Sequence, residues 1–515
     1  MYTFGLVKIL QSLHLNMRSF LSKVNKEYAS IIQAGLFVIF VVVVGIFAFS
    51  HLTESPPTWY DEGMILQLAE NLAQHGVMGM QVAPGGFVSA SHVSTGYPIV
   101  VPVALSFKVF GIGILSARSV AVGYMFLLLG VGFLFLSKMY GKTLAFWGVL
   151  LVASFSSFYG DGKNVLGEVP GLALFLCFLF FLERFIQGSF LKRGDALFAG
   201  IFLGLTIATK PTFLPILPAL LLALVYNRHA IIWKKEWVIA GVAGVVFPIG
   251  IWILTQFGSN DSWSEVLRFY ANPYNLTGIP EVMRHNMLRF FTESTPVYTL
   301  ATFLIWAVAF GIRNQKKLIE HITTSELCAF FFTTLVLLAF LRTPGWYRYL
   351  FIANVLILLF LPSAIATVVR YVSERISWSS LKVDVASYGA TILLCVLFVF
   401  QAHHLIFDSW ISNTTAYRRT ERLSAYFNAL PPQDVVCVYN APEVVPFIKT
   451  KEYYQYFSGV WTAGEGSLLQ IKNNVPDIVV ASEDAVPEVR ALSVAYEEID
   501  EVGGKYIILG RKHSL

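Results

Sequence analysis

The chain has 515 residues, of which 56% are hydrophobic and 13% charged, and its formal net charge is +5. Soluble domains carry about 25% charged residues, so this composition excludes an ordinary soluble protein. The apolar residues form blocks of about 15–22, close to the length of a helix that spans a bilayer. We therefore expect a polytopic α-helical membrane protein, whose basic excess lies in short loops and gives no indication of nucleic-acid binding.

The first 30 residues carry Lys8, Arg18, Lys23 and Lys26 among apolar side chains, and the first long apolar run follows them. That run is longer than the core of about 7–15 residues in a signal peptide, so we do not expect a cleavable signal peptide here. Positively charged flanks remain in the cytoplasm. Residues 1–30 are therefore predicted to form a cytoplasmic, interfacial segment.

Eleven apolar segments within residues 31–407 are predicted to span the membrane as helices. In chain order they are Ile31–Leu52, Ser116–Ser137, Thr143–Phe158, Val169–Ile186, Ala196–Thr209, Pro211–Tyr226, Trp237–Gln256, Val297–Ile312, Leu327–Leu341, Tyr349–Val369 and Ala386–Ala402. We interpret residues 31–407 as one transmembrane module.

One more apolar stretch, Tyr97–Gly111, is short and contains Pro98, Pro102 and Lys108. If this stretch does not cross, the loops rich in Lys and Arg all face the cytoplasm, as the positive-inside rule requires; if it crosses, all of them face outward. We therefore predict a re-entrant or interfacial helix here, with the N-terminus of the chain inside and the C-terminus outside.

In this topology the outer loops contain all of the candidate functional side chains. These loops are TWYDEG (Thr58–Gly63), DGKNVLGE (Asp161–Glu168), ATKP (Ala208–Pro211), the long loop Phe257–Pro296, and RTPGWYRY (Arg342–Tyr349). The inner loops are short and basic. Any chemistry is therefore expected on the non-cytoplasmic face.

Three carboxylates in the outer loops are candidate catalytic groups. Asp61 and Glu62 follow the first span, and Glu168 opens a later one. Each also fits a simpler role, because acids in the first turn of a helix stabilise its dipole, and Thr58 is a suitable N-cap for Asp61 and Glu62. Both interpretations stay open from these segments alone.

Lys210 follows the predicted span Ala196–Thr209. That span has about 14 residues and a length of roughly 21 Å, whereas the hydrocarbon core is about 30 Å thick. Lys210 is therefore predicted to lie recessed in the outer leaflet, where an unpaired lysine costs a few kcal/mol. Its position implies an anionic partner, either a protein carboxylate or the phosphate of a ligand.

The segment RTPGWYRY places Arg342 and Arg348 on either side of a Pro-Gly turn, with Tyr349 next to Arg348. Aromatic and arginine side chains are common at the membrane interface, so a purely anchoring role is one interpretation. The other is phosphate binding, because a guanidinium makes bidentate contacts with phosphate and the turn lets both arginines reach one anion.

After Ala402 the composition becomes polar, and residues 408–515 are predicted to form an extracytoplasmic α/β domain. It has strand-like segments at Val435–Tyr439, Asp477–Ala481 and Lys505–Gly510. We detect no nucleotide-binding motif and no catalytic triad in it. We therefore expect a structural or acceptor-docking module.

The order of these segments resembles the GT-C superfamily of polyprenyl-phosphate-sugar-dependent glycosyltransferases. The residues that carry the resemblance are the acid pair after the first span, the segment YPIVVPVALSFKVFG, the acid in GEVPGLALFL, the TKP step, and the RY of WYRYLFIANVLILLFLP. The pattern is most similar to the family that includes protein O-mannosyltransferases and the lipid A aminoarabinose transferase. It covers roughly residues 31–370 and implies the fold of that superfamily.

The resemblance implies a role for each candidate residue. Asp61, with Glu62 beside it, would be the active-site acid, and Glu168 would contribute a second carboxylate. Lys210 and Arg348, in its RY pair with Tyr349, would bind the lipid phosphate. Many family members carry His-Pro or Lys-Pro where this chain has Gly96-Tyr97-Pro98, so one cation is missing. That cation would have to come from Lys163 or Arg342.

The expected function is transfer of a sugar from a polyprenyl-phosphate donor to an acceptor lipid, glycan or protein, on the outer face of the cell membrane and with inversion. The resemblance implies no required cofactor. A divalent metal lacks support, because the first outer loop has no DxD and His403, His404 and Asp408 match no ligand motif. A glycan ligase or polymerase and a membrane transporter or flippase remain the alternatives. Transporters, however, tend to contain inverted repeats, and we detect none.

Overall fold

The computed structural model describes residues 35–188, 192–228, 234–258, 262–272, 276–315, 322–375, 381–409, 411, 414–448, 453–456, 476–487, 496–502 and 504–511. The chain divides into two compact units, residues 1–50 and 51–515. The described part of the first unit contains the apolar helix Gly35–Phe49, on the first predicted span. The predicted interfacial segment 1–30 lies outside the described residues.

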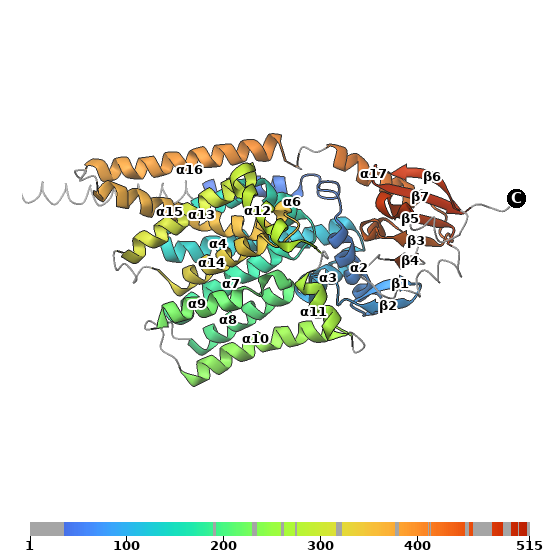
Figure 1. Cartoon of the computed structure of the whole chain (residues 1–515), viewed down its shortest axis with the longest axis horizontal. Coiled ribbons are helices and arrows are strands. Elements are labelled where there is room, and N and C mark those ends of the chain that lie inside the picture. The colour runs from blue at the N-terminus through green and yellow to red at the C-terminus, as the bar shows by residue number, and fades with distance from the viewer. Residues whose placement is uncertain are drawn as a thin grey trace, which may run out of the picture. The chain divides into compact units, whose positions relative to one another are not determined.

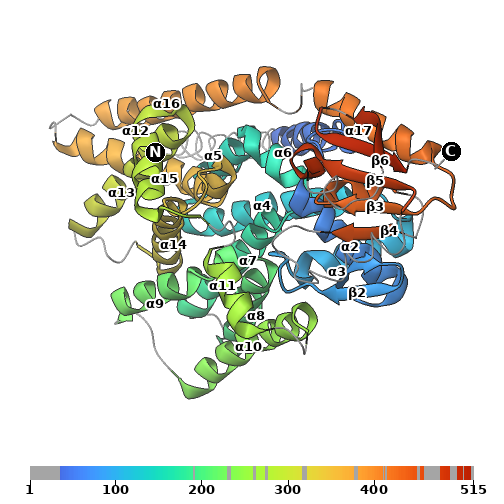
Figure 2. The ribbon, with the colours of Figure 1, turned by 45° about the vertical axis from the view of Figure 1, so that its right-hand side comes forward.

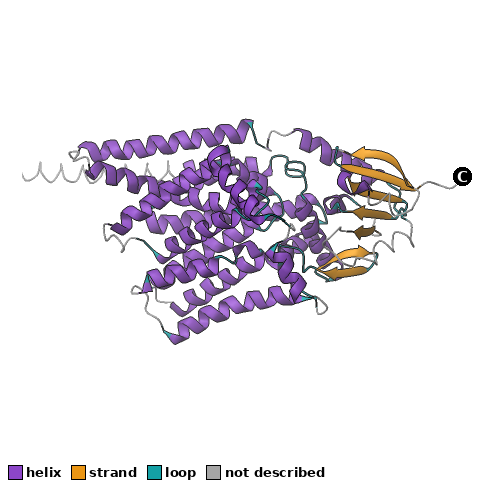
Figure 3. Ribbon diagram, in the orientation of Figure 1, coloured by secondary structure: helices purple, strands orange, loops and turns teal. Residues whose placement is uncertain are grey.

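The second unit is mostly helical, and its strands gather at one end of the helices (Figure 3). Its helices, labelled in Figure 1, are α2 (Tyr60–His75), α3 (Tyr97–Phe110), α4 (Ile114–Tyr140), α5 (Lys142–Ser154), α6 (Ser156–Lys163), α7 (Glu168–Ile186), α8 (Lys192–Thr209), α9 (Ile216–Tyr226), α10 (Lys235–Gln256), α11 (Trp263–Ala271), α12 (Ile279–Thr292), α13 (Ser294–Gln315), α14 (Thr324–Phe340), α15 (Phe351–Arg375), α16 (Leu381–Phe407) and α17 (Thr414–Ala429).

Within the described residues, every predicted span coincides with one helix or with two consecutive helices. Within the described residues, six helices are long and apolar enough to cross a membrane, and α5 with α6, bent by 66°, makes a seventh if the pair is one span. Shorter apolar helices occupy Gly35–Phe49, Tyr97–Phe110, Pro211–Tyr226 and Thr324–Phe340. The predicted polytopic helical fold is confirmed, whereas the number of crossings and their orientation stay predictions.

Helix α8 differs from the prediction in where it begins. It starts at Lys192 instead of Ala196 and has 18 residues, which corresponds to roughly 27 Å. The first turn of α8 is charged, so an apolar pattern does not predict it. Asp195 lies in this turn, where a carboxylate stabilises the helix dipole. Asp195 also pairs with Arg184 at 3.2 Å. Helix length therefore gives no reason for Lys210 to be recessed.

Glycines let α8 and α10 pack backbone to backbone. A Cβ on Gly200 would lie 2.1 Å from the carbonyl oxygen of Gly241, and one on Gly204 would lie 2.6 Å from that of Val245. Across the interface, a Cβ on Gly244 would lie 2.5 Å from the carbonyl oxygen of Leu197. Gly200 and Gly204 form a GxxxG pair, a pattern typical of close helix packing in membranes, and this packing fixes the helix that leads to Lys210.

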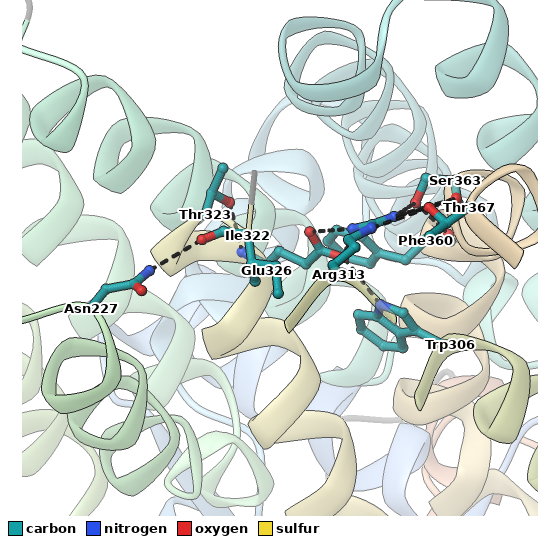
Figure 4. Close-up of polar contacts among 9 residues, drawn as sticks. All are labelled: Asn227, Trp306, Arg313, Ile322, Thr323, Glu326, Phe360, Ser363 and Thr367. Atoms are coloured by element: carbon teal, nitrogen blue, oxygen red, sulfur yellow. Dashed lines mark hydrogen bonds and ion pairs between the residues drawn. The ribbon is translucent and has the colours of Figure 1, made fainter. Parts of the chain in front are cut away.

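A buried ion pair connects α13, α14 and α15 (Figure 4). Nη1 of Arg313 donates to both carboxylate oxygens of Glu326, at 2.7 and 2.9 Å. Its Nη2 donates to the Thr367 hydroxyl at 2.9 Å and the Ser363 carbonyl at 3.3 Å. Because both charges have partners, the pair holds the three helices in one arrangement.

The C-terminal region contains a five-stranded sheet in the order β4-β3-β5-β7-β6. Strand β3 is parallel to β4 and β5, and β7 is antiparallel to β5 and β6. The strands are β3 (Val436–Tyr439), β4 (Tyr453–Tyr456), β5 (Ile478–Ser482), β6 (Tyr496–Val502) and β7 (Tyr506–Arg511). The predicted α/β fold of the C-terminal region is thus confirmed, whereas its bounds and its position outside the membrane stay predictions. The sequence analysis did not predict α17 or the edge strands β4 and β6. The two strands were missed because YYQY and YEEIDEV lack an apolar run.

The sheet shares one hydrophobic core with the segment that contains α2 and α3. Ile65 and Leu68 of α2 and Val103 of α3 belong to the same buried cluster as Val438 and Ile508 of the sheet. A hairpin that the sequence did not predict, β1 (Gly79–Ala83) with β2 (Gly86–Ser89), completes the contact through Met80. Figures 1 and 2 both show α2 where the helices meet the sheet.

Candidate active site

A cavity of about 1310 Å³ opens among α2, α6, α7, α12, η4 (Tyr347–Leu350) and the loop after β3. Among its lining residues are Asp61, Glu168, Lys210, Arg342, Arg348 and Tyr349. The structure therefore brings to one cavity six of the residues selected from the sequence, although they come from four separate loops.

Asp61 lies in the first turn of α2 and pairs with Arg348, whose Nη2 is 2.7 Å from Oδ2. The Arg348 guanidinium lies 5.4 Å from the Trp59 ring centroid, 5.2 Å from that of Trp346 and 5.4 Å from that of Tyr349. These rings attract the cation and restrict its orientation. Asp61 is thus held at the cavity with its side chain 23% exposed, within reach of a ligand.

Lys210 and Glu168 form a second ion pair, with Nζ 2.6 Å from Oε1 and both side chains buried. Two glycines make the approach possible. A Cβ on Gly167 would lie 3.1 Å from the Lys210 Cβ, and one on Gly171 would lie 2.1 Å from the Phe213 ring. The GEVPG and TKPTF segments therefore pack against each other, and the carboxylate partner left open by the sequence is Glu168.

Asp161 also lines the cavity, and the sequence did not select it as a site residue. The predicted span ended at Phe158, but the chain bends after Ser154 and continues as α6. Asp161 interacts electrostatically with Glu168, Arg348 and Lys210. It is therefore a third carboxylate close to both ion pairs.

Helix α12 contributes Arg289, a further cavity residue that the sequence did not reveal. Its Nε lies 2.6 Å from Glu293, and its Nη1 donates to the Gly345 carbonyl. Gly345 has φ +82°, and a Cβ there would lie 2.0 Å from Nη1 of Arg289. The Tyr347 hydroxyl donates to Glu293 at 2.7 Å, and the hydrogen bonds from Tyr347 and Arg289 lower the pKa of Glu293. These contacts clamp the loop that carries Arg348.

Two predicted site residues do not line this cavity. Adjacent helix positions face different directions, so Glu62 does not face the cavity with Asp61. Glu62 is fully buried and forms a bidentate pair with Arg118, at 2.9 and 2.7 Å. Its Oε1 also accepts from the Val165 amide at 3.0 Å. Lys163 is likewise buried, 1% exposed, and lies outside the cavity lining. The structure supports an anchoring role for Glu62, which fixes α2 on α4.

Within the described residues, no group of three or more His, Cys, Asp or Glu side chains is placed to hold a metal ion. His404 and Asp408 line the cavity and contact each other at 3.3 Å. The cations that line it are Lys210, Arg289, Arg342 and Arg348. These cations lie beside the carboxylates of Asp61, Asp161, Glu168 and Glu293, which line the same cavity.

Residues 98–253 match the family model described as dolichyl-phosphate-mannose-protein mannosyltransferase. The structure of ArnT from Cupriavidus metallidurans bound to undecaprenyl phosphate superposes with a TM-score of 0.58 at 14% identity, covering 92% of this chain and 98% of ArnT. The chain has the GT-C fold. The resemblance expected from the order of segments is confirmed.

The oligosaccharyltransferase of Archaeoglobus fulgidus in its apo form is also similar, with a TM-score of 0.53 at 11% identity, covering 88% of this chain and 70% of the archaeal protein. No curated protein sequence matches the chain at a significant level. The family match extends from α3 into α10 and includes Glu168 and Lys210. Asp61 and Arg348 lie outside it.

Proposed function

We propose that this GT-C chain is an integral-membrane glycosyltransferase that moves a sugar from a polyprenyl-phosphate donor to an acceptor on the non-cytoplasmic face. The observation that carries the proposal is the meeting of Asp61, Arg348 and the Lys210–Glu168 pair in one cavity. The fold of ArnT, a protein solved with undecaprenyl phosphate, supports a lipid phosphate as the group that these cations bind.

Asp61 acts as the general base in this proposal. Its carboxylate accepts the proton of an acceptor hydroxyl or amine, and the freed oxygen or nitrogen attacks the anomeric carbon of the donor sugar. As that bond forms, the bond from the anomeric carbon to the phosphate oxygen breaks, and polyprenyl phosphate leaves with the electron pair. A single displacement inverts the anomeric centre.

Arg348 and Lys210 stabilise the negative charge that develops on the leaving phosphate. One Nη2 bond of Arg348 goes to Asp61. A guanidinium has five N–H donors in a planar fork, so the same side chain can orient Asp61 and contact a phosphate. Arg342 adds positive charge to the cavity wall, in place of the cation absent at Gly96-Tyr97-Pro98, whereas the charge of Arg289 is compensated by Glu293. We therefore expect transfer to need no divalent metal.

Transfer of a whole glycan is the second candidate, because the archaeal oligosaccharyltransferase has a similar fold and the cavity is large. It uses the same donor phosphate chemistry and differs in the size of the transferred group. A transporter is less well supported. Its charged side chains would be expected along a path between helices, whereas the charged side chains of this cavity gather beside α2 and η4.

Mass spectrometry of envelope lipids, glycans and proteins, with and without the gene, tests the proposal. We expect a glycosylated species that disappears on deletion and returns with the wild-type gene, its mass distinguishing one sugar from a whole glycan. Identical profiles in deletion and wild-type cells would contradict the glycosyltransferase proposal.

A further inference from the structure

Asn440 is the one described residue of the C-terminal sheet region that lines the cavity. It directly follows β3, whose parallel neighbours β4 and β5 lie on opposite sides of it. In open α/β sheets, ligands bind outside the carboxyl ends of strands at a point where the strand order reverses. Asn440 occupies that point, and the cavity adjoins it.

The backbone fixes where this side chain lies. Asn440 has φ +52°, a conformation that asparagine tolerates better than most residues. Its backbone N–H donates to the backbone carbonyl of Tyr456 at 2.8 Å. The position is therefore determined by the sheet and does not depend on a flexible loop tip.

The sheet is in turn fixed to the helix that carries Asp61. A Cβ on Gly63 would lie 2.3 Å from the carbonyl oxygen of Pro442, so the two backbones touch. Gln67 of α2 donates to the Tyr453 hydroxyl at 2.6 Å and contacts Gln455 at 3.2 Å. Asn440 therefore has a fixed relation to the first turn of α2.

Tyr60, the neighbour of Asp61, contacts the side-chain carboxamide of Asn440. Its hydroxyl donates to Oδ1 of Asn440 at 3.4 Å. Burial, with the charges of Glu443 and Asp61, raises the pKa of Tyr60 well above its usual value, so the hydroxyl keeps its proton. With Oδ1 accepting from Tyr60, the Nδ2 group of Asn440 is left to donate to a ligand.

We propose that Asn440 is an acceptor-binding residue, whose Nδ2 donates to an oxygen next to the atom that Asp61 deprotonates. The neighbouring hydroxyl groups of a sugar ring have this chemistry. This role rests on the proposed transferase function and assigns acceptor binding to the C-terminal region. The proposed role makes Asn440 a specificity-determining residue, because an acceptor without that oxygen leaves Nδ2 of Asn440 unpaired.

Two substitutions test the role in full-length protein. Asn440→Gly removes the side chain and keeps the positive φ without strain. Asn440→Asp preserves the shape but replaces the donor with an acceptor. We expect the gene-dependent glycosylated species to fall about tenfold in cells with Asn440→Gly, as for loss of one hydrogen bond, and further with Asn440→Asp. The affinity of the purified proteins for undecaprenyl phosphate should stay within twofold of wild type. The control Asn428→Ala alters an exposed asparagine of α17 and should change neither quantity.

Each other outcome overturns the role. Wild-type product levels with either variant would mean that donation by Nδ2 is unnecessary. Parallel losses of product and of undecaprenyl phosphate affinity would make Asn440 a structural support of the whole cavity. If wild-type cells show no gene-dependent species, the transferase function itself fails, and the acceptor role fails with it.

Discussion

The Lys210–Glu168 pair allows a test that separates donor binding from internal stabilisation. Both side chains are about 95% buried, with 2.6 Å between Nζ and Oε1. Removing one partner of a buried pair leaves an uncompensated charge and costs about 3–5 kcal/mol, whereas replacing both is often close to neutral. Lys210→Met should therefore lower protein stability markedly, and the double variant Lys210→Met/Glu168→Gln should recover most of the loss.

Binding should behave differently from stability. If Lys210 contacts the lipid phosphate, the double variant stays weak in undecaprenyl phosphate binding although it is stable again, and Glu168→Gln alone binds at least as well as wild type because Lys210 is freed from its carboxylate. The assay is thermal unfolding of the purified full-length proteins beside a titration with undecaprenyl phosphate. Wild-type affinity in the double variant would refute this reasoning, and Lys210 would serve only to neutralise Glu168.

Three further predictions follow from the geometry. Arg348→Lys keeps the charge but loses the planar fork that lies among three rings, so undecaprenyl phosphate affinity should fall about tenfold, and unchanged affinity would exclude a bidentate contact. Gly200→Val places a side chain against the Gly241 carbonyl and should lower the unfolding temperature by several degrees. The control Gly123→Ala in α4, where nothing lies within 4 Å of the added Cβ, should leave it unchanged. Equal effects of the two variants would contradict close packing of α8 on α10. Cysteine labelling from outside intact cells should reach position 61 but not position 234, and labelling of position 234 would overturn the predicted orientation.

The helical fold could be predicted because the bilayer requires long apolar segments, which are visible in the sequence. The gathering of Asp61, Glu168, Lys210 and Arg348 was predictable because the predicted topology places their loops on one side of the membrane. Their pairing was not, since Lys210 with Glu168 and Arg348 with Asp61 depends on contacts between residues 42 and 287 positions apart.

Other features depend on tertiary contacts that leave no local pattern. Glu62 turns away from Asp61 because Arg118, 56 residues later, provides a buried partner. Asp161 reaches the cavity only because the chain bends between α5 and α6. Arg289 is one of several arginines in a long loop, and nothing in its neighbours distinguishes it. Asn440 reaches Tyr60 across 380 positions through the docking of the sheet on α2.

The most direct test of the central claim is the rate of sugar transfer by Asp61→Asn, measured as the gene-dependent glycosylated species formed per protein molecule. Asparagine keeps the size of the side chain but cannot act as the base. We expect a fall of about 10²-fold or more, with undecaprenyl phosphate affinity at least equal to that of wild type, because Arg348 loses the charge of its carboxylate partner. Transfer at a near wild-type rate would contradict this expectation and would move the base to Asp161 or Glu168.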